Sequence, residues 1–123
     1  MRQTVAVDFD GVIHRYSKGW SDGTAYDVPM PGAIDGLKQL MKKYNVYIFT
    51  TRNLRQVEAW FKQHTDIPTI LVGLNQERFQ NKNYVGLSNR KLVAILWIDD
   101  RVLKFEGDWA RTLEQVEEEL HHD

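Results

Sequence analysis

The stretch VAVDFDGVI, residues 5–13, is the most informative part of the sequence for the fold. It contains most of an apolar run, from Thr4 to Phe9, that shows no strict alternation of polar and apolar residues. Such a run is typical of a strand buried on both faces, as in a parallel sheet covered by helices. Asp8 and Asp10 stand at its end, and Gly11 allows a tight turn after them. The stretch therefore predicts a buried strand that leads into two carboxylates.

Three more apolar runs have the same character: residues 46–50 (VYIFT), 69–72 (TILV) and 93–98 (VAILWI). Segments with helical spacing of apolar residues lie between and after the runs, at residues 31–44, from Asn53 to before Pro68, and 108–120. Pro31 suits a first helical turn, whereas Asn53 and Asp108 are good N-caps. The alternation predicts an α/β fold, a Rossmann-like three-layer α/β/α arrangement with a mainly parallel central sheet.

Two long stretches, residues 14–28 and 74–90, show no regular pattern and are expected to be loops. Loops of this length in a small domain are often functional. The first, called the flap below, directly follows the Asp8–Asp10 pair. Its Trp20 could stack on a base or sugar of a substrate, or it could pack the flap onto the body. His14 lies close to the carboxylates, but the sequence shows no partner for it.

Length and composition indicate one folded domain, residues 1–123, because 42% of the residues are hydrophobic and 27% are charged. The absence of cysteine excludes a disulfide framework, a thiolate zinc site and a cysteine nucleophile. No apolar run approaches the ~20 residues that span a bilayer. Asp8 and Asp10 follow the first seven residues at once, so the N-terminus lacks the apolar segment of a signal peptide. We therefore expect a cytoplasmic protein without a membrane partner.

The net charge of −1 hides an asymmetry. Residues 106–123 carry seven acidic side chains against Arg111 alone, which is −6, so the rest of the chain carries +5. The acidic last helix, residues 108–120, therefore follows a mildly basic body, which is compatible with an anionic ligand.

Carboxylates stand at the ends of two predicted strands, Asp8 and Asp10 after the first and Asp99 and Asp100 after the fourth. Ligands of open parallel sheets bind at the carboxyl ends of the strands, where the strand order reverses. Converging carboxylates repel one another unless a cation is present, and Mg²⁺ prefers oxygen ligands. A single Asp after a strand is also a common turn former. The two pairs together predict a metal site.

An anion site is predicted beside the carboxylates. The hydroxyl of Thr50, with the backbone N–H groups of Thr51 and Arg52, precedes the helix that begins at Asn53. Thr50 alone is an ordinary strand end. Arg52 and Arg101 are expected either to contact phosphate or to pair with Asp100.

Four motifs in this order resemble those of the haloacid dehalogenase-like (HAD) superfamily of phosphohydrolases: VAVDFDGVI, VYIFTTR, SNRK and ILWIDDR. They span residues 5–101, essentially the whole domain. The chain looks most like the small members without a cap domain, because the intervals between the motifs leave no room for one. The resemblance implies a HAD-like phosphatase, and the second Asp of the first motif, Asp10, argues against dehalogenase chemistry.

The resemblance also implies roles for individual residues. Asp8 would be the nucleophile that forms an aspartyl-phosphate, and Asp10 would be the general acid and then the base. Mg²⁺ would be held by the Asp8 carboxylate, the Asp10 backbone carbonyl and Asp99, with Asp100 as a further or water-mediated ligand. Thr50, which ends the second motif, is expected to be a catalytic residue with Asp8 and Asp10. Candidate residues for binding substrate or its phosphate are Gly11, Thr51, Arg52 and Trp20.

The catalytic lysine is expected to be Lys91, which matches the third motif. It precedes Asp99 by eight residues, so a straight strand would hold it roughly 20 Å from the carboxyl end. Either the chain before Val93 bends back, or Lys82 in the second loop takes the role. Val12 is a second departure from the family pattern, because many members have Thr there.

The sequence supports three classes of function. The first is a Mg²⁺-dependent phosphomonoesterase whose open site would admit a small molecule, a nucleotide or a macromolecular phosphate, or would be covered by another subunit of a homo-oligomer. The others are a catalytically silent HAD-like binding protein and a receiver-like phosphoacceptor module. Receivers carry the acceptor Asp on a middle strand, whereas Thr50 and Gly73 stand at those strand ends here.

Overall fold

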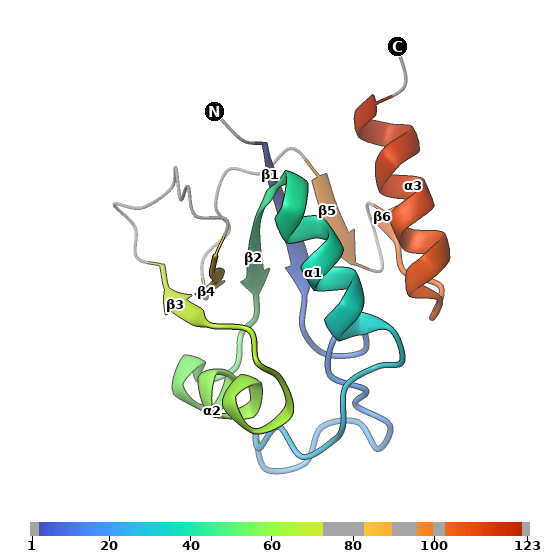
Figure 1. The fold of residues 1–123 in the computed structure, drawn as a ribbon. Coiled ribbons are helices and arrows are strands. Elements are labelled where there is room, and N and C mark those ends of the chain that lie inside the picture. Colours follow the sequence, from blue (N-terminus) through green and yellow to red (C-terminus); the bar gives the residue numbers. More distant parts are fainter. Residues whose placement is uncertain (1–2, 73–82, 90–95, 100–102, 122–123) are drawn as a thin grey trace.

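Strands and helices alternate along most of the chain in the computed structural model, which describes residues 3–72, 83–89, 96–99 and 103–121 (Figure 1). The elements in chain order are β1 (Thr4–Asp8), α1 (Ala33–Lys43), β2 (Asn45–Phe49), α2 (Leu54–His64), β3 (Thr69–Leu71), β4 (Val85–Ser88), β5 (Leu96–Asp99), β6 (Leu103–Lys104) and α3 (Trp109–His121).

The strands form one sheet in the order β3-β4-β2-β1-β5-β6, and every pairing is parallel. From β1 the chain moves to β2 on one side and later returns to β5 on the other, so the strand order reverses at β1. The register pairs Val7 with Ile48 of β2 and with Ile98 of β5. Because the strands are parallel, their carboxyl ends share one edge of the sheet, the lower one in Figure 1. The α/β class with a parallel sheet is confirmed, and its layout is compatible with a Rossmann-like fold.

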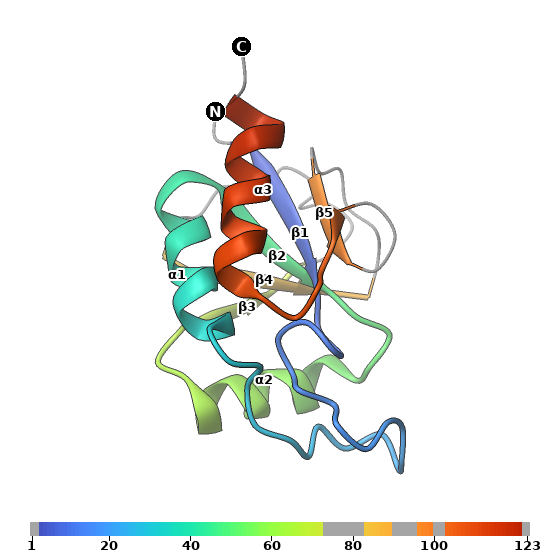
Figure 2. The same ribbon diagram turned by 90° about the vertical axis from the view of Figure 1, so that its right-hand side faces the viewer.

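The main hydrophobic core lies between one face of the sheet and the helices. Helices α1 and α3 lie side by side over this face, whereas α2 lies across the carboxyl ends of the strands (Figure 2). Val5 and Val7 of β1 are completely buried in this core with Leu37 of α1 and Val116 of α3. The opposite face carries a smaller cluster around Ala6 and Tyr47. A helical layer over that second face remains a prediction, since the three described helices all contribute to the main core.

The predicted helix caps are confirmed where side chains form them. The Asn53 side chain accepts a hydrogen bond from the Arg55 N–H at the start of α2. The carboxylate of Asp108 accepts from the N–H groups of Ala110 and Arg111 at the start of α3. Each cap satisfies backbone donors that a helix leaves open at its first turn. Helix α1 starts at Ala33, two residues after the predicted Pro31, because Gly32 adopts a left-handed φ of 81° before it.

The prediction of one loop over residues 74–90 is wrong in part, because residues 85–88 form β4. This strand pairs with β2 on one side and β3 on the other, and all four of its residues are buried. Its sequence, VGLS, is short and contains Gly and Ser, which are poor strand formers. Pairing on both sides supplies the stability that the local sequence lacks. Strand β6 has only two residues, and no sequence pattern indicated it.

The fourth predicted strand, residues 93–98, is described from Leu96 to Asp99 as β5. Residues 93–95 lie outside the described part. Among the described residues, no helix combines the length and the apolarity needed to cross a bilayer.

Candidate functional site

The carboxyl edge of the sheet brings together three of the predicted site residues. Asp8 ends β1, Thr50 directly follows β2, and Asp99 ends β5. The register places Asp8 opposite Phe49, next to Thr50. Asp8 is half-buried, and one of its carboxylate oxygens accepts a hydrogen bond of 2.8 Å from the N–H of Phe9. This edge next to the reversal of strand order is where open α/β sheets bind ligands.

The turn after β1 positions Asp10. The carbonyl of Phe9 accepts hydrogen bonds from the N–H groups of Val12, Ile13 and His14 at 2.9 to 3.3 Å. Gly11 adopts φ = 79°, a left-handed conformation that side chains disfavour, so the tight turn predicted from this glycine is confirmed. The turn brings His14 back beside Asp10, with 2.8 Å between His14 Nδ1 and one Asp10 carboxylate oxygen.

The surroundings of His14 determine which ring nitrogen carries the proton. The imidazole is completely buried and stacks on Phe9 with a centroid separation of 5.1 Å. Its Nε2 accepts a hydrogen bond of 2.9 Å from the N–H of Asp27. A nitrogen that accepts carries no proton, so in the neutral ring Nδ1 carries it and donates to Asp10. His14 therefore has a partner that the sequence analysis did not identify.

Arg52 is the second partner of Asp10. Its Nε lies 2.9 Å from both carboxylate oxygens of Asp10, and its side chain is only 1% exposed. Nη1 donates to the carbonyl of Gly23 in the flap at 2.6 Å. Nη2 is buried and has no hydrogen-bond partner among the described residues. Arg52 thus joins the candidate acid to the flap. Its expected contact with phosphate or with Asp100 stays a prediction, because Asp100 lies outside the described residues.

The segment after β2 contains the residues predicted to bind an anion. The hydroxyl oxygen of Thr50 accepts a hydrogen bond from the N–H of Arg52 at 3.1 Å. This backbone donor is therefore already used, while the Thr50 hydroxyl keeps its own proton to donate. Thr51 is exposed. The Asn89 side chain donates to the carbonyls of Thr50 and Arg52 at 2.6 and 2.9 Å.

Asn89 is a residue that the sequence analysis missed, although it belongs to the SNRK motif. It directly follows β4, so it stands at the same edge of the sheet as Thr50. Its role in holding the segment after β2 depends on a strand that the sequence pattern did not reveal. The only sequence signal for this role was the position of Asn89 shortly after two apolar residues, Val85 and Leu87.

The flap is held by a network of its own. The carboxylate of Asp27 accepts hydrogen bonds from the hydroxyl and the N–H of Ser17 and from the N–H of Val28. The hydrogen bonds from Ser17 lower the pKa of Asp27 to about 2. The flap is also anchored to α2, because the indole N–H of Trp60 donates to the carbonyl of Asp27 at 2.8 Å. Most of the flap therefore has a defined conformation over the carboxyl edge.

Trp20 was expected either to pack the flap onto the body or to stack on a substrate, and its surroundings are compatible with both roles. Its ring lies against the Arg52 guanidinium, whose central carbon is 4.9 Å from the ring centroid, so it contributes to the packing of the flap. At the same time 63% of the side chain is exposed. Tyr16, which is half-buried, lies on Arg52 as well, at 5.5 Å.

The remaining predicted site residues lie outside the described residues. These are Lys82, Lys91, Asp100 and Arg101, and of Asp99 the backbone alone is described. The described residues contain no group of three or more His, Cys, Asp or Glu side chains that could hold a metal ion. The predicted metal set draws on Asp99 and Asp100, so the magnesium site stays a prediction.

Comparison of the chain with models of protein families, with curated proteins and with solved structures found no match. The function is therefore inferred from the residues and geometry of the chain itself.

Proposed function

We propose that this protein is a Mg²⁺-dependent phosphomonoesterase of the HAD-like, capless type that works through an aspartyl-phosphate. The observation that carries the proposal is the arrangement around Asp8 and Asp10. Asp8 ends the strand at which the strand order reverses, and Asp10 follows two residues later with its carboxylate held by Arg52 and His14.

The chemistry follows from these two carboxylates. An Asp8 oxygen attacks the phosphorus of the substrate, the bond from phosphorus to the ester oxygen breaks, and protonated Asp10 gives its proton to the leaving oxygen. A water molecule then attacks the aspartyl-phosphate while Asp10 takes a proton from it. The bond from phosphorus to Asp8 breaks, which releases inorganic phosphate and restores the Asp8 carboxylate. The overall reaction consumes one ester and one water.

The contacts of Asp10 hold its carboxylate in one orientation, which suits the step in which the ionised group takes a proton from water. Two rigid, buried donors, Arg52 Nε and His14 Nδ1, fix the carboxylate. A group held in its reactive orientation avoids the cost of reorganising during the reaction. The same donors occupy both carboxylate oxygens, so Asp10 is suited to bind a metal through its backbone carbonyl, as the resemblance implies.

The donor chemistry of the edge fits Mg²⁺. The Asp8 carboxylate and the Asp10 carbonyl are hard oxygen donors, and Asp99 stands at the end of the neighbouring strand. When bound, the ion would neutralise charge on the phosphoryl oxygens. The Thr50 hydroxyl and Lys91 or Lys82 are the proposed protein donors to the same oxygens.

The proposal is tested by hydrolysis of an aryl phosphate with and without Mg²⁺. We expect Mg²⁺-dependent release of phosphate by the wild type, loss to background in Asp8→Asn, and a fall of roughly 10²- to 10⁴-fold in Asp10→Asn. Asp66→Asn is the matched control, because Asp66 is exposed and pairs with Lys38. Activity that survives in Asp8→Asn would overturn the nucleophile assignment.

A further inference from the structure

A hollow of about 510 Å³ opens in the flap beside Trp20. Its lining consists of Lys18, Trp20, Ser21, Asp22, Thr24 and Tyr26. Its volume lies in the range of pockets that bind small ligands, roughly 300 to 1,000 Å³. Trp20 is 63% exposed, so a large flat apolar surface is available to a ligand.

The walls of the hollow are held in place within the flap. The Tyr26 hydroxyl accepts a hydrogen bond of 2.8 Å from the N–H of Lys18 and donates one of 3.0 Å to the carbonyl of Gly19. The Asp22 carboxylate accepts from the N–H of Thr24 at 3.0 Å. A hollow whose walls are fixed before binding costs a ligand less ordering entropy.

Arg52 connects the hollow with the reacting centre. Its guanidinium lies over the ring of Trp20, and its Nε contacts the carboxylate of Asp10. A single side chain therefore separates the exposed indole from the residue that protonates the leaving oxygen. A phosphate ester bound at Asp8 would have its leaving group at Asp10, which Arg52 connects with the indole. Because Arg52 covers one face of that indole, a ligand ring would stack on the surface that remains exposed. The Nη2 of Arg52, which has no hydrogen-bond partner among the described residues, is one more buried donor on this side chain.

The lining indicates the chemistry of that leaving group. Flat aromatic rings stack on Trp, and the hollow adds a cation, Lys18, and an anion, Asp22. Hydrogen bonds with Thr24 lower the pKa of Asp22, so this side chain is an acceptor for N–H or O–H groups at neutral pH. Because the hollow has one charge of each sign, it does not favour a second phosphate group. A neutral ring with hydrogen-bond donors and acceptors on its edge can interact with both Lys18 and Asp22.

We propose that the hollow binds the base of a nucleotide, stacked on Trp20, while the phosphate of that nucleotide is hydrolysed at Asp8. The inference rests on the proposed phosphomonoesterase function and names its substrate class. The base belongs either to a free nucleoside monophosphate or to the terminal residue of an oligonucleotide, because both present the same ring and the same ester.

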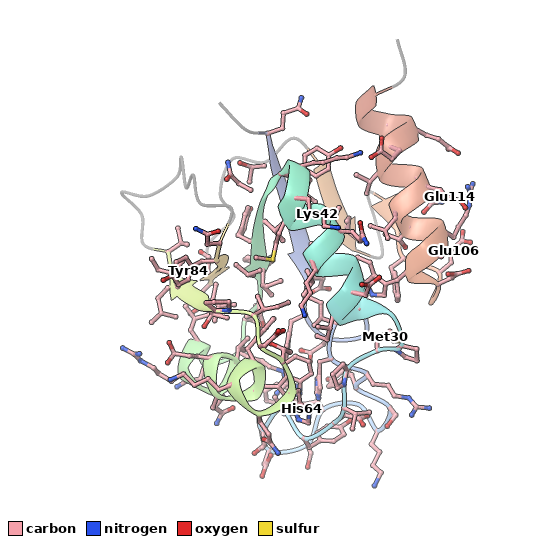
Figure 3. All side chains as sticks on the ribbon, in the orientation of Figure 1. Met30, Lys42, His64, Tyr84, Glu106 and Glu114 are labelled. Carbon is pink, nitrogen blue, oxygen red and sulfur yellow. The ribbon has the colours of Figure 1, made fainter. Side chains whose placement is uncertain are left out.

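The test compares substrates with and without a base. Adenosine 5′-monophosphate and adenosine 3′-monophosphate are compared with ribose 5-phosphate, which has no ring to stack. We expect Trp20→Ala to lower the ratio of kcat/KM for the preferred adenosine monophosphate to that for ribose 5-phosphate by about tenfold, within the range of base stacking on aromatic side chains. Trp20→Phe should retain most of the ratio. Tyr84→Ala is the control, because Tyr84 is 39% exposed and lies outside the flap (Figure 3).

A binding measurement separates this inference from the proposed function. In the Asp8→Asn background, adenosine monophosphate should quench tryptophan emission, and Trp20→Phe should remove the quenching. Oligonucleotides with a 5′- or 3′-terminal phosphate distinguish the two sources of the base. No hydrolysis of any phosphate by the wild type would reject the proposed function. Hydrolysis with an unchanged ratio in Trp20→Ala, and no quenching that depends on Trp20, would reject the nucleotide site alone.

Discussion

At the scale of single residues, the orientation of the Asp10 carboxylate is set by two neighbouring side chains, Arg52 and His14. Arg52 offers one N–H, at 2.9 Å from both oxygens, and His14 offers another at 2.8 Å. Arg and His donate from rigid planar groups, so the two together fix the direction of the carboxylate. Both donor side chains are buried, whereas 25% of the Asp10 side chain is exposed.

Replacement of Arg52 by Lys should therefore impair the chemical step. The ammonium keeps the charge but cannot reproduce the planar group that contacts Asp10, Gly23 and the two aromatic rings. We expect kcat of Arg52→Lys to fall about tenfold or more with a smaller change in KM. The kcat of Arg52→Ala should fall further. Steady-state kinetics on an aryl phosphate measure both constants. Equal activities of Arg52→Lys and wild type would contradict the positioning role.

At the scale of elements, the flap is an ordered loop whose conformation depends on a carboxylate. The pKa of Asp27 lies near 2 in the folded protein because of its hydrogen bonds with Ser17, below its ordinary value of 3.8. A lowered pKa means that folding favours the ionised form. The stabilisation is complete above pH 3.8 and is lost as the pH falls through about 2.

Asp27→Asn should remove this pH dependence. At neutral pH the variant should have a lower free energy of unfolding than the wild type, and the difference should shrink as the pH falls from 3.8 toward 2. Denaturant titrations at several pH values measure this difference in the free energy of unfolding. Asp35→Asn, at an exposed position in α1, serves as the control. A difference that stays constant over this interval would show that the Asp27 carboxylate does not stabilise the flap.

At the scale of the whole molecule, Trp109 joins three parts of the fold. Its indole belongs to α3, is 2% exposed, and donates a hydrogen bond of 3.0 Å to the carbonyl of Val12 in the turn after β1. Its ring covers Gly36 of α1 so closely that a Cβ at Gly36 would lie 2.4 Å from a ring carbon. Trp109 therefore connects α1, α3 and the turn after β1.

Gly36→Ala should destabilise the whole domain. Alanine ordinarily favours a helix by about 1 kcal/mol over glycine, but overpacking in a filled core costs roughly 1–3 kcal/mol. Because the Trp109 ring is fixed by its hydrogen bond, the second effect should win, with a net loss of up to about 2 kcal/mol. Guanidinium unfolding measures it, with the exposed α1 substitution Gln39→Ala as the control. A more stable Gly36→Ala would show that the ring moves aside.

Elements whose signals are local could be predicted from the amino-acid sequence. The buried runs of β1 and β2, the caps Asn53 and Asp108, and the tight turn at Gly11 follow from neighbouring residues, because hydrophobic periodicity and capping act over a few positions. The parallel sheet followed from their alternation, and it brought Asp8 and Thr50 to one edge as predicted.

Only the tertiary structure decided the contacts between distant parts of the chain. Strand β4 exists because β2 and β3 pair with it, and Asn89 reaches Thr50 only through that strand. The ion pair of Arg52 with Asp10 joins residues 42 positions apart, and the His14 proton is placed by the backbone of Asp27. Such contacts leave no periodic trace in a sequence, because they depend on how folded segments meet and on which donors that meeting leaves buried.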